Sequence, residues 1–193
     1  MPTEFNGLDH AYFMREALKE AEMAAEAGEL PIGALLVHDG KIVARGHAHH
    51  HARRSKIAHA EMSVLLEAEQ YLDAHPHMCI IYTTVEPCVM CLGAIVMSNI
   101  SDIVFGLPDN WIQPRGMLGI DYVRRRITNY VGGVLADESL MLWRKIRPQD
   151  LEMMLSGKRL ETQPDSVGLF WRHNDDAPAT ERKGQDDDEN KQA

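Results

Sequence analysis

The chain has few cysteines and no long apolar segment. Three cysteines in 193 residues are too few for the disulfide framework of a small secreted domain, and two of them form a C-x-x-C pair. Cys79, the third, lies in an apolar run and is expected in the core. No segment is long enough to span a bilayer, and the N-terminus lacks a basic region followed by an apolar run. We therefore expect a cytoplasmic protein without membrane contact.

Basic residues are also scarce. Twenty Lys and Arg stand against 29 Asp and Glu, a formal net charge of -9. From Arg172 onward seven acids face four bases, which gives -3 and leaves -6 on the body. This balance disfavours a general nucleic-acid binder, because neutralised phosphates supply most of such affinity.

The length suits one domain with a proper core. We expect a single domain over residues 1–160 and a C-terminal tail over residues 161–193. The composition from about residue 172 onward is typical of disorder.

Strand-like and helical segments alternate along the predicted domain. Asp9 is a good N-cap for a first helix with small alanines on its buried face. Two apolar runs, 31–37 and 41–46, flank Asp39-Gly40, which predicts a hairpin. Asp137 is expected to cap a later helix. Helices alternating with strands after an opening hairpin predict an α/β fold with a mixed sheet covered on both faces.

The strongest functional pattern joins a histidine to the cysteine pair. His59 opens a predicted helix, and Cys88 and Cys91 open the next one, directly after the strand-like run 80–85. One imidazole and two thiolates suit Zn²⁺, which leaves its fourth position to water in catalytic sites. Pro87 is well suited to a helix start, and the helix dipole there favours thiolates over thiols. We predict that His59, Cys88 and Cys91 bind zinc.

Glu61 lies two residues past the zinc histidine, in the same helical turn. Zinc lowers the pKa of a bound water to about 7, but a proton must still travel to the leaving group. Glu61 is close enough to carry it without binding the metal, so we predict that it is catalytic.

Three other features keep two interpretations each. The histidines over 47–51 either contact an anionic substrate or bind stray metal, or they lie in a solvated loop, which we favour. Trp111 either covers a substrate pocket or fills a gap under its loop. The very apolar cysteine helix either packs in the core or forms a subunit interface.

With these residues in hand, the chain resembles the cytidine deaminase-like superfamily, whose signature is H-x-E followed by P-C-x-x-C. It is most similar to the branch of cytosine deaminases and tRNA adenosine deaminases, over roughly residues 9 to 145. The motifs that carry the resemblance are Pro31-Ile32-Gly33, His59-Ala60-Glu61, Pro87-Cys88-Val89-Met90-Cys91 and Val104-Phe105-Gly106.

The resemblance implies a three-layer α/β/α fold with a five-stranded sheet, usually as a homodimer. It also implies the reaction: zinc-bound hydroxide attacks the ring carbon that bears the amine, Glu61 relays the proton, and ammonia leaves. Backbone groups of Ala60 and Glu86 would hold the base, and Trp111 occupies the place of a pocket aromatic.

Two departures concern the substrate. The branch usually has an asparagine eleven residues before the zinc histidine, where this chain has Ala48. The tRNA enzymes have a lysine and small residues after the aspartate at Asp109, whereas Asn110-Trp111-Ile112 follows here. The substrate contact at Ala48 has therefore been lost or moved, and the RNA-binding loop is not reproduced.

Three functions remain. We favour a zinc-dependent hydrolase that deaminates a small nucleobase or nucleoside, with cytosine first and guanine or adenine as alternatives. The second is a tRNA adenosine-to-inosine deaminase, for which basic residues at 53, 54, 56 and 124–126 would gather into a patch. The third is a non-catalytic zinc-containing subunit, which the presence of Glu61 disfavours.

Overall fold

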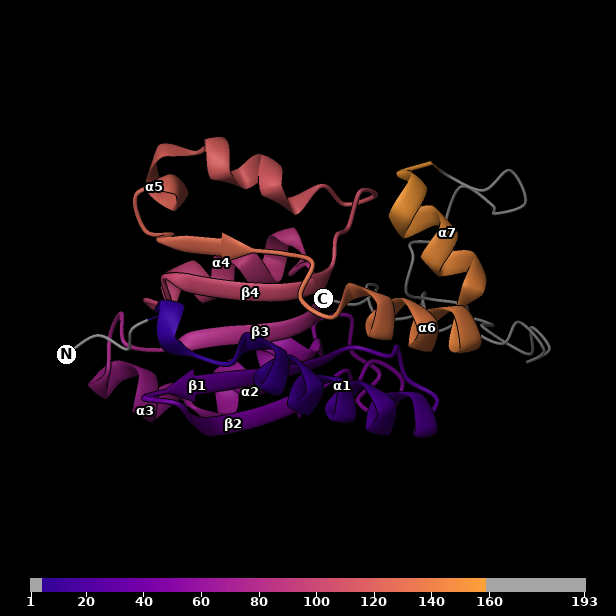
Figure 1. The fold of residues 1–193 in the computed structure, drawn as a ribbon, viewed down its shortest axis with the longest axis horizontal. Helices are drawn as coiled ribbons and strands as arrows, with labels where there is room; N and C mark the ends of the chain where they lie inside the picture. Colours follow the sequence, from indigo (N-terminus) through magenta and orange to yellow (C-terminus); the bar gives the residue numbers. More distant parts are fainter. Residues whose placement is uncertain (1–4, 159–193) are drawn as a thin grey trace, which may run out of the picture.

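The computed structural model describes residues 5–158, which form one five-stranded sheet with helices on both faces (Figure 1). The predicted tail, residues 161–193, lies outside the described residues. The elements in chain order are η1 Phe5–Gly7, α1 His10–Glu26, β1 Gly33–His38, β2 Lys41–His47, α2 Ala60–Glu67, α3 Glu69–Ala74, β3 Ile80–Val85, α4 Val89–Met97, β4 Asp102–Leu107, η2 Pro114–Gly119, α5 Asp121–Arg124, β5 Asn129–Val131, α6 Ala136–Ile146 and α7 Pro148–Ser156.

The sheet has the order β2-β1-β3-β4-β5. β1 pairs antiparallel with both β2 and β3, whereas β3, β4 and β5 are parallel. The hairpin turn has positive φ at both Asp39 and Gly40, as a tight two-residue turn requires. The predicted mixed sheet and three-layer α/β/α fold are thus confirmed.

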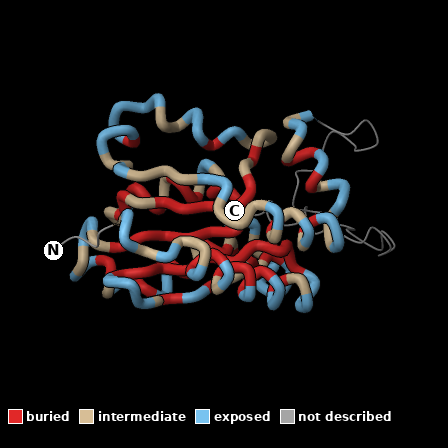
Figure 2. Tube along the Cα trace, in the orientation of Figure 1, coloured by how far each residue is buried: buried red, intermediate tan, exposed pale blue. Residues whose placement is uncertain are grey.

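The central strands are buried on both faces because successive side chains point in opposite directions. In β1, Leu35 and Val37 pack with Phe13 and Met14 of α1, whereas Leu36 faces the other layer. α2 and α4 cover that second face. Figure 2 shows the central strands β1, β3 and β4 buried along nearly their whole length. The runs that looked uniformly apolar in the sequence are therefore strands sandwiched between helices.

α1 packs closely on the sheet. The Asp9 side chain accepts a hydrogen bond from the Tyr12 N–H at 2.9 Å, which confirms the predicted cap. Gly33 lies against the Ala17 carbonyl and the Ala21 amide, and a Cβ atom there would collide with both. Glycine at the start of β1 thus permits the close approach of this helix.

α6 begins differently from the prediction. Leu135, in the left-handed conformation with φ 51°, occupies the N-cap position, and Asp137 lies inside the first turn. The Val134 N–H is already bonded to the Phe105 carbonyl, so the chain must turn sharply to leave the sheet. Asp137 therefore does not cap the helix, although its negative charge suits a first turn.

Within residues 5–158, no helix is both long enough and apolar enough to cross a membrane.

Candidate metal centre and active site

Two helix starts bring the three predicted zinc ligands together. His59 is the residue before α2, Cys88 is the residue before α4, and Cys91 lies in the first turn of α4. The Nδ1 atom of His59 lies 3.6 Å from Cys88 Sγ and 3.5 Å from Cys91 Sγ. A tetrahedral zinc ion with ordinary bond lengths holds its nitrogen and sulfur ligands about 3.6 Å apart. The spacing therefore fits zinc.

The other nitrogen of His59 fixes the orientation of the ring. Nε2 lies 3.1 Å from the Lys56 carbonyl oxygen, which only accepts hydrogen bonds, so Nε2 carries the proton. Nδ1 then presents its lone pair toward the two sulfur atoms. This arrangement is how proteins commonly orient a metal-binding histidine.

The two sulfur atoms interact with each other and with His59. A hydrogen bond from the Cys91 thiol, helped by His59, lowers the pKa of Cys88 to about 4. Cys88 is thus a thiolate at neutral pH, the form that binds metal.

Glu61 is buried beside the metal ligands, with 3% of its surface exposed. Thr83 Oγ1 donates to Glu61 Oε1 at 3.3 Å, and Cys91 Sγ lies 3.5 Å from Oε2. Burial raises the pKa of this carboxyl above its ordinary value. A carboxyl with a raised pKa, in the helical turn that follows the metal ligand His59, is suited to taking up and releasing a proton.

Glu86 is the second buried carboxylate of the site. It accepts hydrogen bonds from the Asp109 N–H at 2.9 Å and the Tyr130 hydroxyl at 2.9 Å. Arg115 adds a bidentate ion pair, with Nη2 at 2.6 Å from Oε2 and Nε at 3.2 Å from Oε1. These three partners join the end of β3 to the loop after β4 and to β5.

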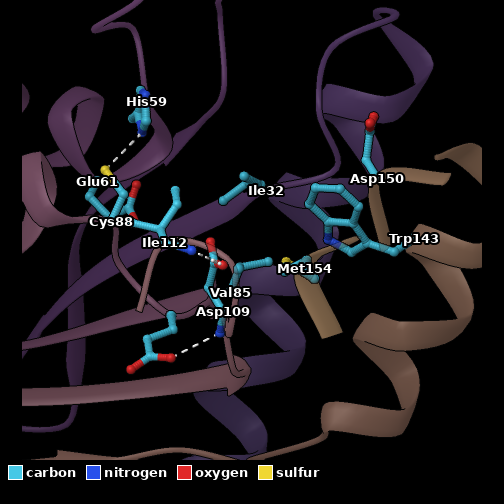
Figure 3. A pocket seen from close by; sticks show the side chains of 11 residues that line it. Ile32, His59, Glu61, Val85, Cys88, Asp109, Ile112, Trp143, Asp150 and Met154 are labelled. Atoms are coloured by element: carbon cyan, nitrogen blue, oxygen red, sulfur yellow. Dashed lines mark hydrogen bonds between the residues drawn. The ribbon is translucent and has the colours of Figure 1, made fainter. Parts of the chain in front are cut away.

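Asp109 shapes that loop. Its Oδ1 atom accepts from the N–H groups of Trp111 and Ile112, both at 2.9 Å. Burial raises the pKa of the Asp109 carboxyl. This turn directs Ile112 toward the metal site, as Figure 3 shows.

A pocket extends from the metal ligands to the last two helices (Figure 3). Its zinc side is lined by His59, Glu61, Glu86 and Cys88, and its remaining wall by Ile32, Val85, Asp109, Ile112, Trp143, Asp150 and Met154. Polar side chains thus lie at both ends of the pocket, with apolar ones between them. Apolar walls with a few placed polar groups are typical of a small-molecule or base-binding site.

Comparison with known proteins identifies the family. Residues 8–107 match the model for the cytidine and deoxycytidylate deaminase zinc-binding region, which is more than half of the chain. The chain belongs to this deaminase family. Its zinc site is the one formed by His59, Cys88 and Cys91.

Individual relatives show which deaminases this chain is similar to. A tRNA-specific adenosine deaminase of Bacillus subtilis (strain 168) is 47% identical over 98 residues, 50% of this chain and 61% of that protein. Less than two thirds of this relative is therefore covered. A solved structure from work on A-to-I editing by tRNA:A34 deaminases has a TM-score of 0.62 and 30% identity, covering 69% of this chain and 99% of the other. A guanine deaminase of Nitrosomonas europaea has a TM-score of 0.61 and 25% identity, covering 72% and 85%.

The other predicted site residues of this deaminase-family chain occupy different places. Ala60 is buried at the start of α2, directly beside the metal ligand His59. Ala48 is also buried, and its N–H donates to the Ile32 carbonyl. Neither Ala48, Ala60 nor Trp111 lines the pocket, whereas Glu86 does. Substrate contacts by these four residues remain predictions.

His50 belongs to the histidine loop over residues 47–51 that was expected to be solvated, and the structure instead buries it. The buried His50 ring lies 4.7 Å from the His59 ring, and burial lowers the pKa of His50 to about 4. Four further residues of the site were not predicted. Trp143 and Met154 form the far wall, and Arg115 and Tyr130 hold Glu86. Only the fold brings these residues to the site, since no local spacing links them to the zinc motif.

Proposed function

We propose that this chain is a hydrolytic deaminase that converts adenosine to inosine in tRNA. The observation that carries the proposal is the 47% identity over 98 residues to a tRNA-specific adenosine deaminase. The tRNA:A34 deaminase structure supports it, since its whole length is covered at 30% identity. These relatives favour the tRNA substrate, the second of the predicted functions, over the cytosine-like base that the sequence placed first.

The chemistry needs an activated water and a proton carrier. Bound at His59, Cys88 and Cys91, zinc supplies hydroxide at neutral pH by lowering the pKa of a water. Glu61 is placed to take the proton from this water and pass it to the ring nitrogen and the departing amine. Oxygen adds to the ring carbon, the carbon–nitrogen bond breaks, and ammonia leaves.

The rest of the pocket supports this reaction in two ways. Its apolar wall excludes bulk water, which strengthens the electrostatic interactions of Glu61. Thr83 holds Oε1 of Glu61, so that the second oxygen keeps its direction. The backbone groups of Ala60 and Glu86 remain the proposed contacts for the base.

The basic residues divide into two groups instead of one patch. Arg53, Arg54 and Lys56 are exposed on the loop that leads to His59. Arg124–Arg126 precede β5, at the amino end of the parallel strands, whereas Cys88 follows the carboxyl end of β3. We therefore assign RNA-backbone contacts to the first group alone, which lies beside the zinc site.

Inosine formation tests the proposal. The zinc-loaded protein is incubated with tRNA that has adenosine at the wobble position, and with free bases and nucleosides, while ammonia and inosine are measured. We expect inosine from tRNA, no product with Glu61→Gln, and binding that weakens steeply with salt. Turnover of a free base without any turnover of tRNA would contradict the proposal.

A guanine or related free purine is the second candidate substrate. The loop Asp109–Arg115 lacks the lysine of the tRNA enzymes, and its one arginine is already paired with buried Glu86. The N. europaea guanine deaminase has a similar fold over 85% of its chain. Release of ammonia from guanine in the same panel would favour this candidate.

We also propose a homodimer in the cytoplasm. Leu66 of α2 and Val89 and Met97 of α4 are exposed on the helical layer beside the zinc site. Exposed apolar residues on neighbouring helices are typical of an interface. Light scattering should show twice the chain mass, and Leu66→Glu with Met97→Glu should halve it. Met23→Glu, at an equally exposed position on α1, is the matched control.

A further inference from the structure

Trp143 places an unsatisfied hydrogen-bond donor in the pocket wall. The residue lies in α6 and only 2% of its surface is exposed. Its indole Nε1 is buried, and within residues 5–158 no atom accepts a hydrogen bond from it. Buried polar groups are nearly always paired in folded proteins, because an unpaired one costs free energy. This donor therefore calls for a partner that the described chain does not supply.

The position of Trp143 is fixed from outside the pocket. Ser139, one helical turn earlier on the same face, donates from Oγ to the Thr84 carbonyl at 2.9 Å. Thr84 Oγ1 in turn accepts from the Gly33 N–H at 3.1 Å. These bonds hold α6 against the ends of β3 and β1, so the indole ring cannot easily turn away.

The side chains between the indole and the metal ligands are apolar, whereas the carboxylate of Asp150 lines the same end of the pocket as the indole. Figure 3 shows its nitrogen on the edge of the ring that faces Met154, while Glu61 and Cys88 lie at the opposite end of the pocket. Ile32 and Val85 line the space between them. The pocket is therefore polar at the zinc end and apolar in the middle, and its far end holds the buried N–H donor of Trp143 and the Asp150 carboxylate.

We propose that Trp143 Nε1–H donates a hydrogen bond to a ring nitrogen of the substrate base other than the one beside the reacting carbon. This inference rests on the proposed deaminase function and adds a specificity-determining residue to it. An indole N–H only donates, so the base must present an acceptor there. In adenine the acceptors beyond the reacting carbon and its neighbouring nitrogen are N3 and N7. An amino group at the same place would leave two donors facing each other.

A cycle of one substitution and two substrate analogues tests the contact. Trp143→Phe keeps an aromatic ring and removes the N–H. The substrates are an anticodon stem-loop with adenosine, 3-deazaadenosine or 7-deazaadenosine at the wobble position, since each analogue replaces one acceptor nitrogen by carbon. Tyr12→Phe is the matched control, because it removes an O–H donor from an exposed ring on α1 that does not line the pocket.

We expect Trp143→Phe to lower kcat/KM about three- to tenfold on adenosine, mainly through KM, at unchanged zinc content. One of the two analogues should lose a similar factor with the wild-type protein and lose nothing further with Trp143→Phe. The Tyr12→Phe control should respond to that analogue as the wild type does. Independent losses for both analogues, or unchanged kinetics in Trp143→Phe, would overturn the inference.

Two further measurements keep the result unambiguous. If Trp143→Phe fails to fold, the ¹⁵N-labelled indole signal of Trp143 is assigned by elimination with Trp111→Phe and Trp171→Phe. Addition of the stem-loop should move that signal downfield, and an unmoved signal would overturn the inference. If only a free purine is turned over, the tRNA proposal fails, and the same cycle on the deaza forms of that purine still decides the role of Trp143.

Discussion

The two ends of the pocket are built in different ways. The zinc end comes from residues 59–91, where each functional side chain lies at or near the start of a helix. The far end comes from residues 109–154, mostly beyond the segment that matches the deaminase family model. The reaction is thus encoded in short local motifs, whereas the shape that selects the substrate is assembled by long-range packing. Changes at the zinc end should abolish the chemistry, and changes at the far end should alter affinity or stability.

The largest effect is expected from Glu61→Gln. The amide cannot carry the proton, so kcat should fall about 10²- to 10⁴-fold, the range for loss of a general acid–base group. Zinc content, measured by atomic absorption, should stay at one ion per chain, because Glu61 is not a ligand. A variant that retained more than a tenth of the wild-type rate would show that another group carries the proton.

Arg115→Met should mainly affect the loop after β4, which contributes Asp109 and Ile112 to the pocket lining. Glu86, whose side chain is fully buried, would keep Tyr130 and Asp109 as partners but lose its ion pair. Since Arg115 is 49% exposed and partly screened, we expect a loss of about 1–3 kcal/mol in the free energy of unfolding.

Denaturant unfolding measures this loss, and a rise in KM should accompany it. The control is Arg124→Met, which removes an arginine from an exposed pair with Asp121 and should change little. Equal losses in the free energy of unfolding would show that the pair with buried Glu86 stabilises the fold no more than the exposed pair with Asp121.

Ser139→Ala should have a smaller effect. It removes the hydrogen bond to the Thr84 carbonyl, which costs about 1 kcal/mol for a buried neutral pair. Because α6 then loses its anchor, KM should rise while zinc content and the proton-transfer step are preserved. Thermal unfolding and steady-state kinetics check this, with Ser156→Ala at the end of α7 as the control. A fall in kcat at unchanged KM would contradict the assignment of the chemistry to the zinc end and of substrate affinity to the far end.

The smallest effect concerns Cys79, whose thiol pKa is shifted in the opposite direction from that of Cys88. Hydrogen bonding lowers the pKa of Cys88, whereas burial raises the pKa of Cys79 to about 11. A raised thiol pKa means that the unfolded chain loses its proton first as pH rises, so the folded state loses stability above the ordinary pKa of about 9.

Cys79→Val should remove this contribution, worth about 1 kcal/mol at pH 10. The difference between wild type and variant in the free energy of unfolding, measured from pH 8 to pH 10, isolates it, because all other titrating groups are shared. A difference that does not change with pH would show that Cys79 is not desolvated in the folded state.

The residues of the zinc end could be predicted because their geometry is local. A histidine and a glutamate two apart share a helical turn, and two cysteines three apart share a helix start, whatever the rest of the chain does. The hairpin and the alternation of strands and helices likewise predicted the mixed sheet. The substrate could not be predicted in this way, and the relatives favour tRNA where the sequence favoured a small base.

The sequence by itself therefore determined the metal site, the position of Glu61 beside it and the layered sheet. Only the tertiary structure decided what surrounds the substrate. Glu86 meets Arg115 from 29 residues away and Tyr130 from 44, and Ser139 reaches Thr84 across 55 residues. Such contacts depend on how α6, β5 and the loop after β4 dock on the sheet, and docking is set by the packing of the whole core.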